Sequence, residues 1–139
     1  MCGRSASPLY GALVMILSVL ANIDVDSLLR ATDFYCRALG LRVGRRFGSS
    51  AVELLGGSTA IYLLEKPSGT PASAESPVLR DYTRHWTPVH LDFVVPEIQS
   101  AVVQARNAGA RVRASRVKYA PTIGAALLSW PIHSGTGSV

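Results

Sequence analysis

The chain has 139 residues, of which 48% are hydrophobic, and a formal net charge of +5. This length and composition suffice for one compact domain and argue against a second independent domain. The arginines are scattered and do not alternate with aromatic residues, which argues against a nucleic-acid partner. Only Cys2 and Cys36 are present, without the spacing of zinc or redox motifs, which excludes a disulfide scaffold and favours a cytoplasmic protein.

The apolar stretch 9–20 has two interpretations. It could be the core of a signal peptide, with Val19 and Ala21 at the small-residue cleavage positions, although it is too short to cross a bilayer. Its second half also looks like a strand that takes part in an internal repeat. We therefore expect Met15 to be the natural start, residues 1–14 to be an N-terminal extension, and no membrane to be a partner.

The first half of the chain predicts one strand, one helix and a meander of three strands. Apolar residues recur at helical spacing up to Leu39, and Gly40 follows where a helix commonly ends. Asp26 or Ser27 supplies a side-chain oxygen at the start of this helix. Glycine turns separate the later strands. The expected strands are Ile16–Ile23, Leu41–Phe47, Ala51–Leu55 and Ala60–Glu65.

The pattern restarts after a segment rich in Pro, Ser and Gly, which reads as a linker. We expect a strand over Val89–Val95, a helix from Pro96 to Gly109, and a strand over Ala110–Ala114. An offset of seventy residues places Ile23 on Phe93 and Val25 on Val95, with the helices also in register. Two unrelated strand-helix units would share some of this spacing, but the agreement in helix length favours an internal duplication.

Two groups of motifs resemble the vicinal-oxygen-chelate superfamily, which contains glyoxalase I, the bleomycin-resistance proteins and the extradiol dioxygenases. In the first half they are Asn22–Ser27, Asp33-Phe34-Tyr35 and Ala38–Leu41. In the second half they are Pro88–Val95 and Ala108-Gly109-Ala110. The resemblance covers about Met15 to Val117, and the order and spacing of the motifs are more specific than any one of them.

The resemblance implies an α+β fold in which paired βαβββ modules curl around a shared cleft, with the second module incomplete. The expected organisation is an N-terminal extension (1–14), a first βαβββ module (15–66), a linker (67–87), the start of a second module (88–117) and an aberrant C-terminal tail (118–139). A homodimer is left open.

The family often holds a divalent metal between the first and last strands of its modules, and imidazole and carboxylate ligands suit Fe, Ni, Zn or Mn. Of the corresponding positions here, Leu20 and Leu63 cannot coordinate a metal. Glu65 follows Leu63 by two residues and so shares its face, and His90 opens the second module. These two are the candidate metal ligands, although a lone histidine on an apolar strand is often a packed core residue.

Three functions follow as expectations from this resemblance. The first is a glyoxalase-like or dioxygenase-like enzyme whose small substrate chelates a metal that acts as Lewis acid. The second is a metal-free binding protein of the bleomycin-resistance type, in which Tyr62, Trp86 and Phe93 line a cleft for an aromatic or cationic small molecule. The third is an inactive copy. The sequence indicates no nucleophile, general base or substrate.

The tail departs from the family pattern after Val117. A shift of one base permits the codons from Trp130 onward to encode Ala-Asp-Pro-Phe-Gly-His-Gly-Phe-Cys, which resembles the family's terminal turn and strand. We therefore hypothesise a frameshift upstream of Ile123; an ordinary disordered Gly-Ser-Thr tail is the alternative. Loss of the last family strands would expose a sheet edge, and Ala125–Trp130 is apolar enough to form one improvised strand.

Overall fold

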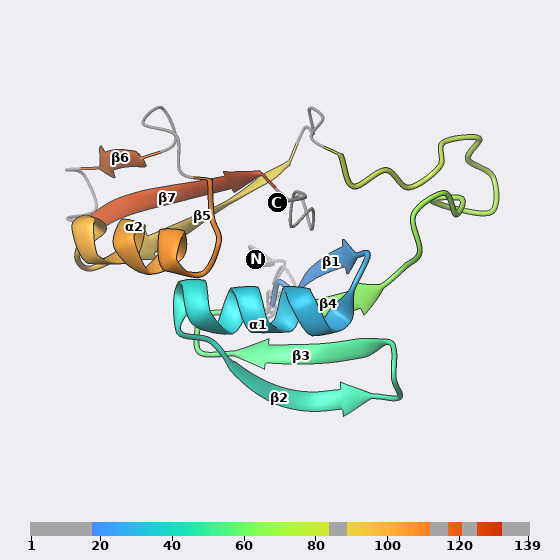
Figure 1. The fold of residues 1–139 in the computed structure, drawn as a ribbon, viewed down its shortest axis with the longest axis horizontal. Coiled ribbons are helices and arrows are strands. Elements are labelled where there is room, and N and C mark those ends of the chain that lie inside the picture. The colour runs from blue at the N-terminus through green and yellow to red at the C-terminus, as the bar shows by residue number, and fades with distance from the viewer. Residues whose placement is uncertain (1–17, 84–88, 112–116, 121–124, 132–139) are drawn as a thin grey trace, which may run out of the picture.

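The computed structural model describes residues 18–83, 89–111, 117–120 and 125–131, and within them two sheets, each accompanied by one helix (Figure 1). The residues expected to form the N-terminal extension lie outside the described part. No described helix has the length and apolarity needed to cross a membrane.

The first half folds as a βαβββ module. Its elements are β1 (Ala21–Val25), α1 (Leu28–Leu39), β2 (Arg42–Phe47), β3 (Ala51–Leu55) and β4 (Ile61–Glu65). The sheet order is β1-β4-β3-β2, with β1 parallel to β4 and the other pairs antiparallel. This confirms the predicted helix and meander, although the first strand begins at Ala21, later than expected.

Helix α1 begins and ends at the residues that its sequence indicates. Ser27 has extended backbone and its Oγ accepts a hydrogen bond from the Arg30 amide at 3.4 Å. At the other end, Gly40 adopts φ = 67°, a left-handed conformation that glycine tolerates because it lacks a Cβ. After Gly40 the chain therefore turns into β2.

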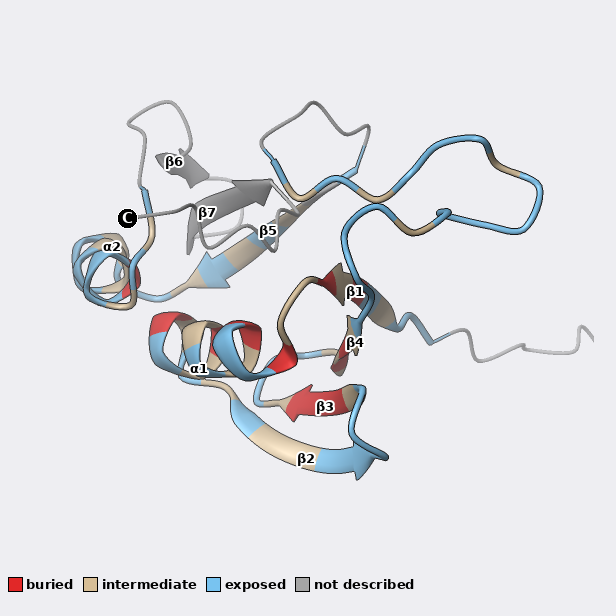
Figure 2. Cartoon of the chain, turned by 45° about the vertical axis from the view of Figure 1, so that its right-hand side comes forward, coloured by how far each residue is buried: buried red, intermediate tan, exposed pale blue. Residues whose placement is uncertain are grey.

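The hydrophobic core lies between α1 and one face of this sheet (Figure 2). Alternate residues of each strand point to the same face, so each buried strand contributes a pair of aliphatic side chains. The helix contributes Leu28, Ala31 and Tyr35. The strand residues of the core are Ile23, Val25, Val52, Leu54, Ile61 and Leu63.

Strand β2 is an edge strand with a bulge. Val43 pairs with Leu54 and Arg46 pairs with Val52, so Gly44 and Arg45 together lie opposite the single residue Glu53. A bulge of this kind inserts one residue and redirects its side chain. It places the Arg45 side chain against Glu53, where the two form hydrogen bonds.

Within its described residues, the second half repeats the strand-helix unit but not the rest of the module. Its elements are β5 (His90–Val95), α2 (Ile98–Asn107), β6 (Val117–Ala120) and β7 (Ala125–Pro131). Val25 and Val95 end their strands, and the helices begin at Leu28 and Ile98, so the seventy-residue offset is confirmed.

In the second sheet the order is β5-β7-β6, and β7 runs antiparallel to both neighbours, unlike β4 beside β1. The improvised strand expected over Ala125–Trp130 corresponds to β7, while β6 was not predicted. Residues Ala110 and Arg111 are not in a strand, and the rest of the expected strand over 110–114 lies outside the described residues.

The segment between the two halves is mostly exposed, as its composition predicts, but hydrogen bonds hold its first part together. Pro71 forms an isolated bridge with Leu79. The Arg80 guanidinium lies 2.8 Å from Asp24 of β1 and donates further hydrogen bonds to Thr70 and to the Pro71 and Ala72 carbonyls. Arg80 thereby fastens this loop to the first sheet.

Candidate functional site

The face of the first sheet that points away from α1 carries a cluster of interacting polar and aromatic side chains. We call this face the open face, and its cluster consists of Arg45, Phe47, Glu53 and Tyr62. Glu53 and Tyr62 are cross-strand partners whose neighbours Val52 and Leu63 belong to the core, so both side chains point to the opposite side.

Glu53 is the centre of the cluster. Its Oε1 accepts hydrogen bonds from Arg45 Nη2 at 2.7 Å and from the Tyr62 hydroxyl at 2.8 Å. Its Oε2 accepts from Arg45 Nε and from the Arg45 backbone amide, both at 3.1 Å. The residue is only 5% exposed, so a buried carboxylate is fully paired here rather than left without partners.

The bulge and its glycine make this arrangement possible. Arg45 turns its backbone amide toward the Glu53 carboxylate because the bulge interrupts the β2–β3 ladder. A Cβ on Gly44 would lie 2.6 Å from Glu53 Oε2 and 2.9 Å from Leu55 Cδ1. Only glycine therefore leaves the carboxylate enough room at this position.

The cluster fixes the charge state of each member. Hydrogen bonds from the Arg45 side chain, then from its amide and from Tyr62, lower the pKa of Glu53 to about 2. The hydrogen bond to Glu53 raises the pKa of Tyr62, and the same carboxylate raises the pKa of Arg45. At neutral pH the cluster holds a carboxylate, a guanidinium and a neutral phenol, with no group poised to exchange a proton.

An aromatic surface adjoins the ion pair. The Phe47 and Tyr62 rings are 5.5 Å apart between centroids, and the Arg45 guanidinium carbon lies 5.4 Å from the Phe47 centroid. Phe47 is 43% exposed. Tyr62, one of the predicted substrate-binding residues, is thus part of a partly exposed aromatic surface.

Phe93, another predicted substrate-binding residue, does not belong to the open-face cluster with Tyr62. Phe93 of β5 packs against the hydrophobic core, on the side of the sheet that α1 covers. Trp86 lies outside the described residues. The role of both in ligand binding stays a prediction.

Glu65, predicted as a metal ligand, is located at the start of α1. Its Oε2 accepts a hydrogen bond from the Leu28 backbone amide at 2.6 Å, where the helix has unsatisfied N–H groups and a partial positive charge. Its alternation with Leu63 and Ile61 puts it on the helix side of the sheet, not on the open face. The carboxylate is therefore already engaged in a structural interaction.

His90, the other predicted metal ligand, is the first residue of β5 and pairs with Pro131. Among the residues that the structure describes, no group of three or more His, Cys, Asp or Glu side chains could hold a metal ion. The described donors thus do not fit the metal that the family resemblance implies. Cys36 supplies no activated thiolate either, because burial and then Asp33 raise its pKa.

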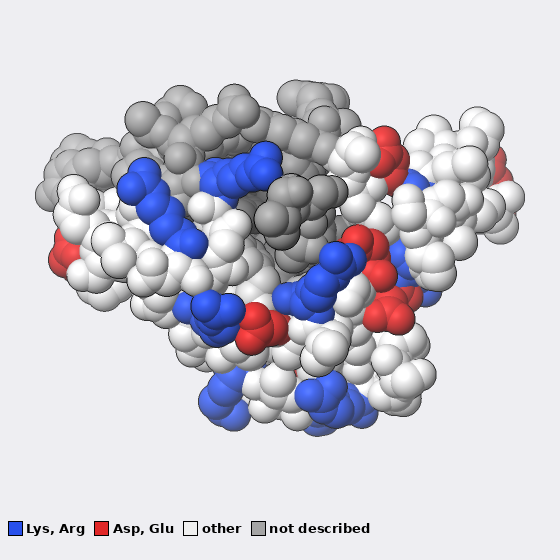
Figure 3. Space-filling model, in the orientation of Figure 1, with Lys and Arg blue, Asp and Glu red and all other residues white. Residues whose placement is uncertain are grey.

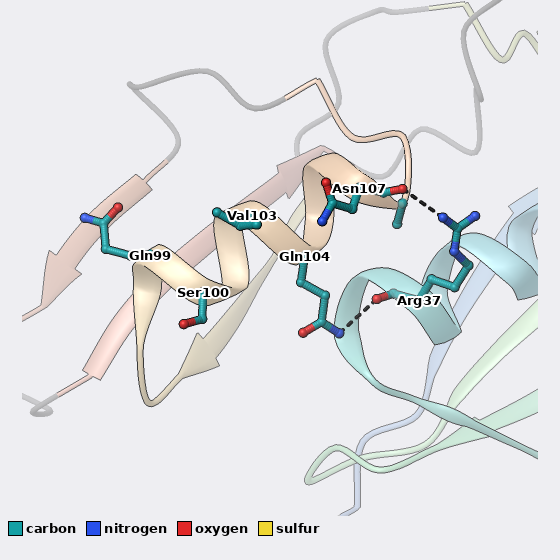
Figure 4. Close-up of a pocket in the computed structure, with 7 residues that line it drawn as sticks. Arg37, Gln99, Ser100, Val103, Gln104 and Asn107 are labelled. Atoms are coloured by element: carbon teal, nitrogen blue, oxygen red, sulfur yellow. Dashed lines mark hydrogen bonds between the residues drawn. The ribbon is translucent and has the colours of Figure 1, made fainter.

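A depression of about 600 Å³ lies between the C-terminal end of α1 and helix α2 (Figure 4). The Arg37 side chain donates to the Asn107 carbonyl and the Gln104 side chain donates to the Arg37 carbonyl, both at 2.8 Å. These bonds join the ends of the two helices, and none of the predicted site residues lines the depression. We interpret it as a consequence of how the two halves pack.

Sequence reasoning missed three of the four residues in the open-face cluster. One signal was available: Glu53 is an acid in the middle of the otherwise apolar strand Ala51–Leu55. A buried acid predicts a basic partner, and Arg45 follows a glycine on the neighbouring strand. The bulge that brings the two together could not be inferred from periodicity.

The βαβββ module, the repeated strand-helix unit and the open sheet face define the class of proteins to which this chain is similar. The model of the glyoxalase-like domain family matches residues 21–130, from the first residue of β1 into β7. The chain belongs to this family, and with it to the vicinal-oxygen-chelate superfamily. The match runs past Val117, where the resemblance seen in the sequence ends. No curated protein matches the chain.

Several solved structures are similar to parts of the chain. A hypothetical protein from S. aureus is 33% identical to this chain, with a TM-score of 0.31. The alignment covers 37% of this chain and 39% of that protein. Lactoylglutathione lyase from Agrobacterium tumefaciens is 21% identical, with a TM-score of 0.33, and the alignment covers 45% of this chain and 46% of that protein. The chain thus spans less than half the length of these two proteins.

A protein from the mobile metagenome of V. Pseudocholerae is 21% identical, with a TM-score of 0.48, and the alignment covers 81% of this chain and 83% of that protein.

Proposed function

We propose that this chain binds a small aromatic molecule on the open face of its first sheet, and that binding requires no metal. The observation that carries the proposal is the Arg45–Glu53–Tyr62 cluster, which holds the Tyr62 ring beside the half-exposed ring of Phe47. Family membership supports a small molecule as the ligand. A fixed ring pair is a surface on which a planar ligand loses little conformational freedom by stacking.

The alternative, a glyoxalase-like or dioxygenase-like enzyme with a divalent metal, rests on family membership alone. Its candidate ligands are His90 and Glu65, and the Glu65 carboxylate is bonded to the start of α1. The Arg45–Glu53–Tyr62 cluster beside Phe47 supports the binding function. We therefore place the binding function first.

Amide NMR titration tests the proposal. Naphthoate, neutral naphthamide and a naphthyl trimethylammonium salt are each added to the protein in excess EDTA. At least one probe is expected to bind and to shift the amide signals of β2, β3 and β4 around Arg45, Glu53 and Tyr62. Shifts confined to the α2 depression, or binding that appears only when a divalent metal replaces the EDTA, would overturn the proposal.

Two substitutions at Tyr62 form a matched pair for this experiment. Tyr62→Phe keeps the ring, so we expect it to retain the probe. Tyr62→Leu removes the ring and is expected to weaken binding about tenfold, the scale of one lost aromatic stacking contact. Phe93→Leu serves as the control, because Phe93 packs on the core side, and it should leave the affinity unchanged.

A further inference from the structure

The Arg45 guanidinium has one edge inside the cluster and one edge that forms no hydrogen bond with another described residue. Nε and Nη2 donate to Glu53, and Nη2 also donates to the Tyr62 hydroxyl at 2.7 Å. Nη1 forms no hydrogen bond within the described part of the chain, and the side chain is 67% exposed. Two N–H donors of a guanidinium, already held in place by Glu53, are therefore available to a ligand.

The Tyr62 hydroxyl offers a ligand much less. It donates its proton to Glu53 and accepts a hydrogen bond from Arg45, so its strongest interactions are made inside the cluster. Both Glu53 oxygens are likewise occupied, by three N–H groups of Arg45 and by Tyr62. What the cluster presents outward is a pair of aromatic rings and a positively charged edge.

The surrounding charge has the same sign. Edge strand β2 carries Arg42, Arg45 and Arg46 and no acid, and basic side chains follow the lower rim of the molecule where β2 lies (Figures 1 and 3). Asp24, whose alternation with core residues also directs it to the open face, forms an ion pair with Arg80. Neither Asp24 nor Glu53 is left to attract a cation.

Building on the proposed function, we propose that the open face selects a planar aromatic carboxylate. Its ring system lies against Phe47 and Tyr62, and its carboxylate accepts hydrogen bonds from Arg45 Nη1. A guanidinium fixed from behind by Glu53 loses little freedom when it binds a carboxylate, and such charge-assisted bonds are among the stronger ones in proteins. This reverses the charge expected of a ligand of the bleomycin-resistance type.

The charge of the probe tests this inference separately from the binding function. Isothermal titration in EDTA compares naphthoate with naphthamide and with the naphthyl trimethylammonium salt, which share a ring system. We expect naphthoate to bind about tenfold more tightly than naphthamide, with an affinity that falls as NaCl is added. If the cation binds as tightly as naphthoate, and Tyr62→Leu weakens both, the binding function stands and the inference fails. If no probe binds, both fail.

Substitutions in the ion pair should act in opposite directions. Arg45→Lys keeps the positive charge beside Glu53 but loses the free guanidinium edge, so naphthoate should bind about tenfold more weakly. Glu53→Gln removes the charge that partly neutralises Arg45, so naphthoate should bind about two- to fivefold more tightly. Loss of fold would weaken binding in both variants, and an increase with Glu53→Gln cannot arise that way.

The neighbouring residue Arg46 provides the control. It pairs with Val52, so its side chain is on the opposite side of the sheet from the cluster. Arg46→Gln removes the same charge from the same strand and should change naphthoate affinity less than twofold. An effect of Arg46→Gln as large as that of Arg45→Lys would show that general surface charge and not the Arg45 edge attracts the anion.

Discussion

Replacement of Gly44 by alanine tests whether the open-face cluster is packed as described. The added Cβ would lie 2.6 Å from Glu53 Oε2 and 2.9 Å from Leu55 Cδ1, well inside van der Waals contact. The Glu53 carboxylate has no easy retreat, because four hydrogen bonds from Arg45 and Tyr62 hold it. The variant must displace either this carboxylate or the bulge.

Two effects of opposite sign set the magnitude. Overpacking of this kind costs about 1–3 kcal/mol in the free energy of unfolding. Alanine also restricts the unfolded chain, which stabilises the protein by about 0.4–1 kcal/mol when the native backbone is compatible, as it is at Gly44, whose φ is not positive. We expect a net loss of about 1–2 kcal/mol, or a fall in Tm of roughly 3–8 °C.

Gly57→Ala is the matched control. The nearest atom to its Cβ would be the Thr59 carbonyl oxygen at 3.5 Å, an ordinary contact, and the φ of Gly57 is not positive either. Only the effect on the unfolded chain applies, so this variant should be as stable as the parent or slightly more stable. Urea unfolding followed by circular dichroism measures both. If Gly44→Ala were as stable as Gly57→Ala, the carboxylate could not be packed against Gly44.

Four further predictions concern other parts of the structure. The pKa of Glu53 is lowered from its ordinary value of 4.5 to about 2, so its ion pair contributes stability above about pH 4.5 that is lost as the pH falls toward 2. The difference in urea midpoint between parent and Glu53→Gln should shrink over that range, and a constant difference would contradict the prediction. Glu65→Ala should cost about 1 kcal/mol by exposing the Leu28 amide at the start of α1, whereas Glu65→Gln should cost less, both measured by urea unfolding. Arg80→Ala should speed proteolysis within residues 67–81, because the fastening to Asp24 is lost, while Arg42→Ala should leave the rate unchanged. Metal analysis of the purified protein should find no stoichiometric Fe, Ni, Zn or Mn; a stoichiometric metal that disappears in His90→Ala would favour the enzyme instead.

The first half of the fold could be predicted from the sequence because its local signals agree. Ser27 and Gly40 mark the ends of α1, and glycines separate strands whose apolar residues alternate. The duplication gave the start of the second half for the same reason. The pairing of the last strands could not be predicted, because the apolar residues of 125–130 indicate a strand but no direction, and antiparallel β7 follows no pattern set by β4.

The frameshift hypothesis stays a prediction, and the codons from Ile123 onward test it directly. A single-base shift must restore the Asp-Pro-Phe-Gly-His string for the hypothesis to hold.

The candidate site shows where sequence patterns stop being informative. The family resemblance indicated Glu65 as a metal ligand, because it lies two residues beyond a ligand position on the same face. In the structure its carboxylate instead accepts a hydrogen bond from the Leu28 amide, because α1 packs on the sheet there. Glu53, which no motif singled out, became the organising residue because a bulge supplied it with an arginine. Whether a carboxylate holds a metal, a helix or an arginine depends on which donor the backbone brings within 3 Å, a property of tertiary structure. In this chain the described hydrogen-bond donors to Glu53 and Glu65 are peptide amides, a guanidinium and a phenol.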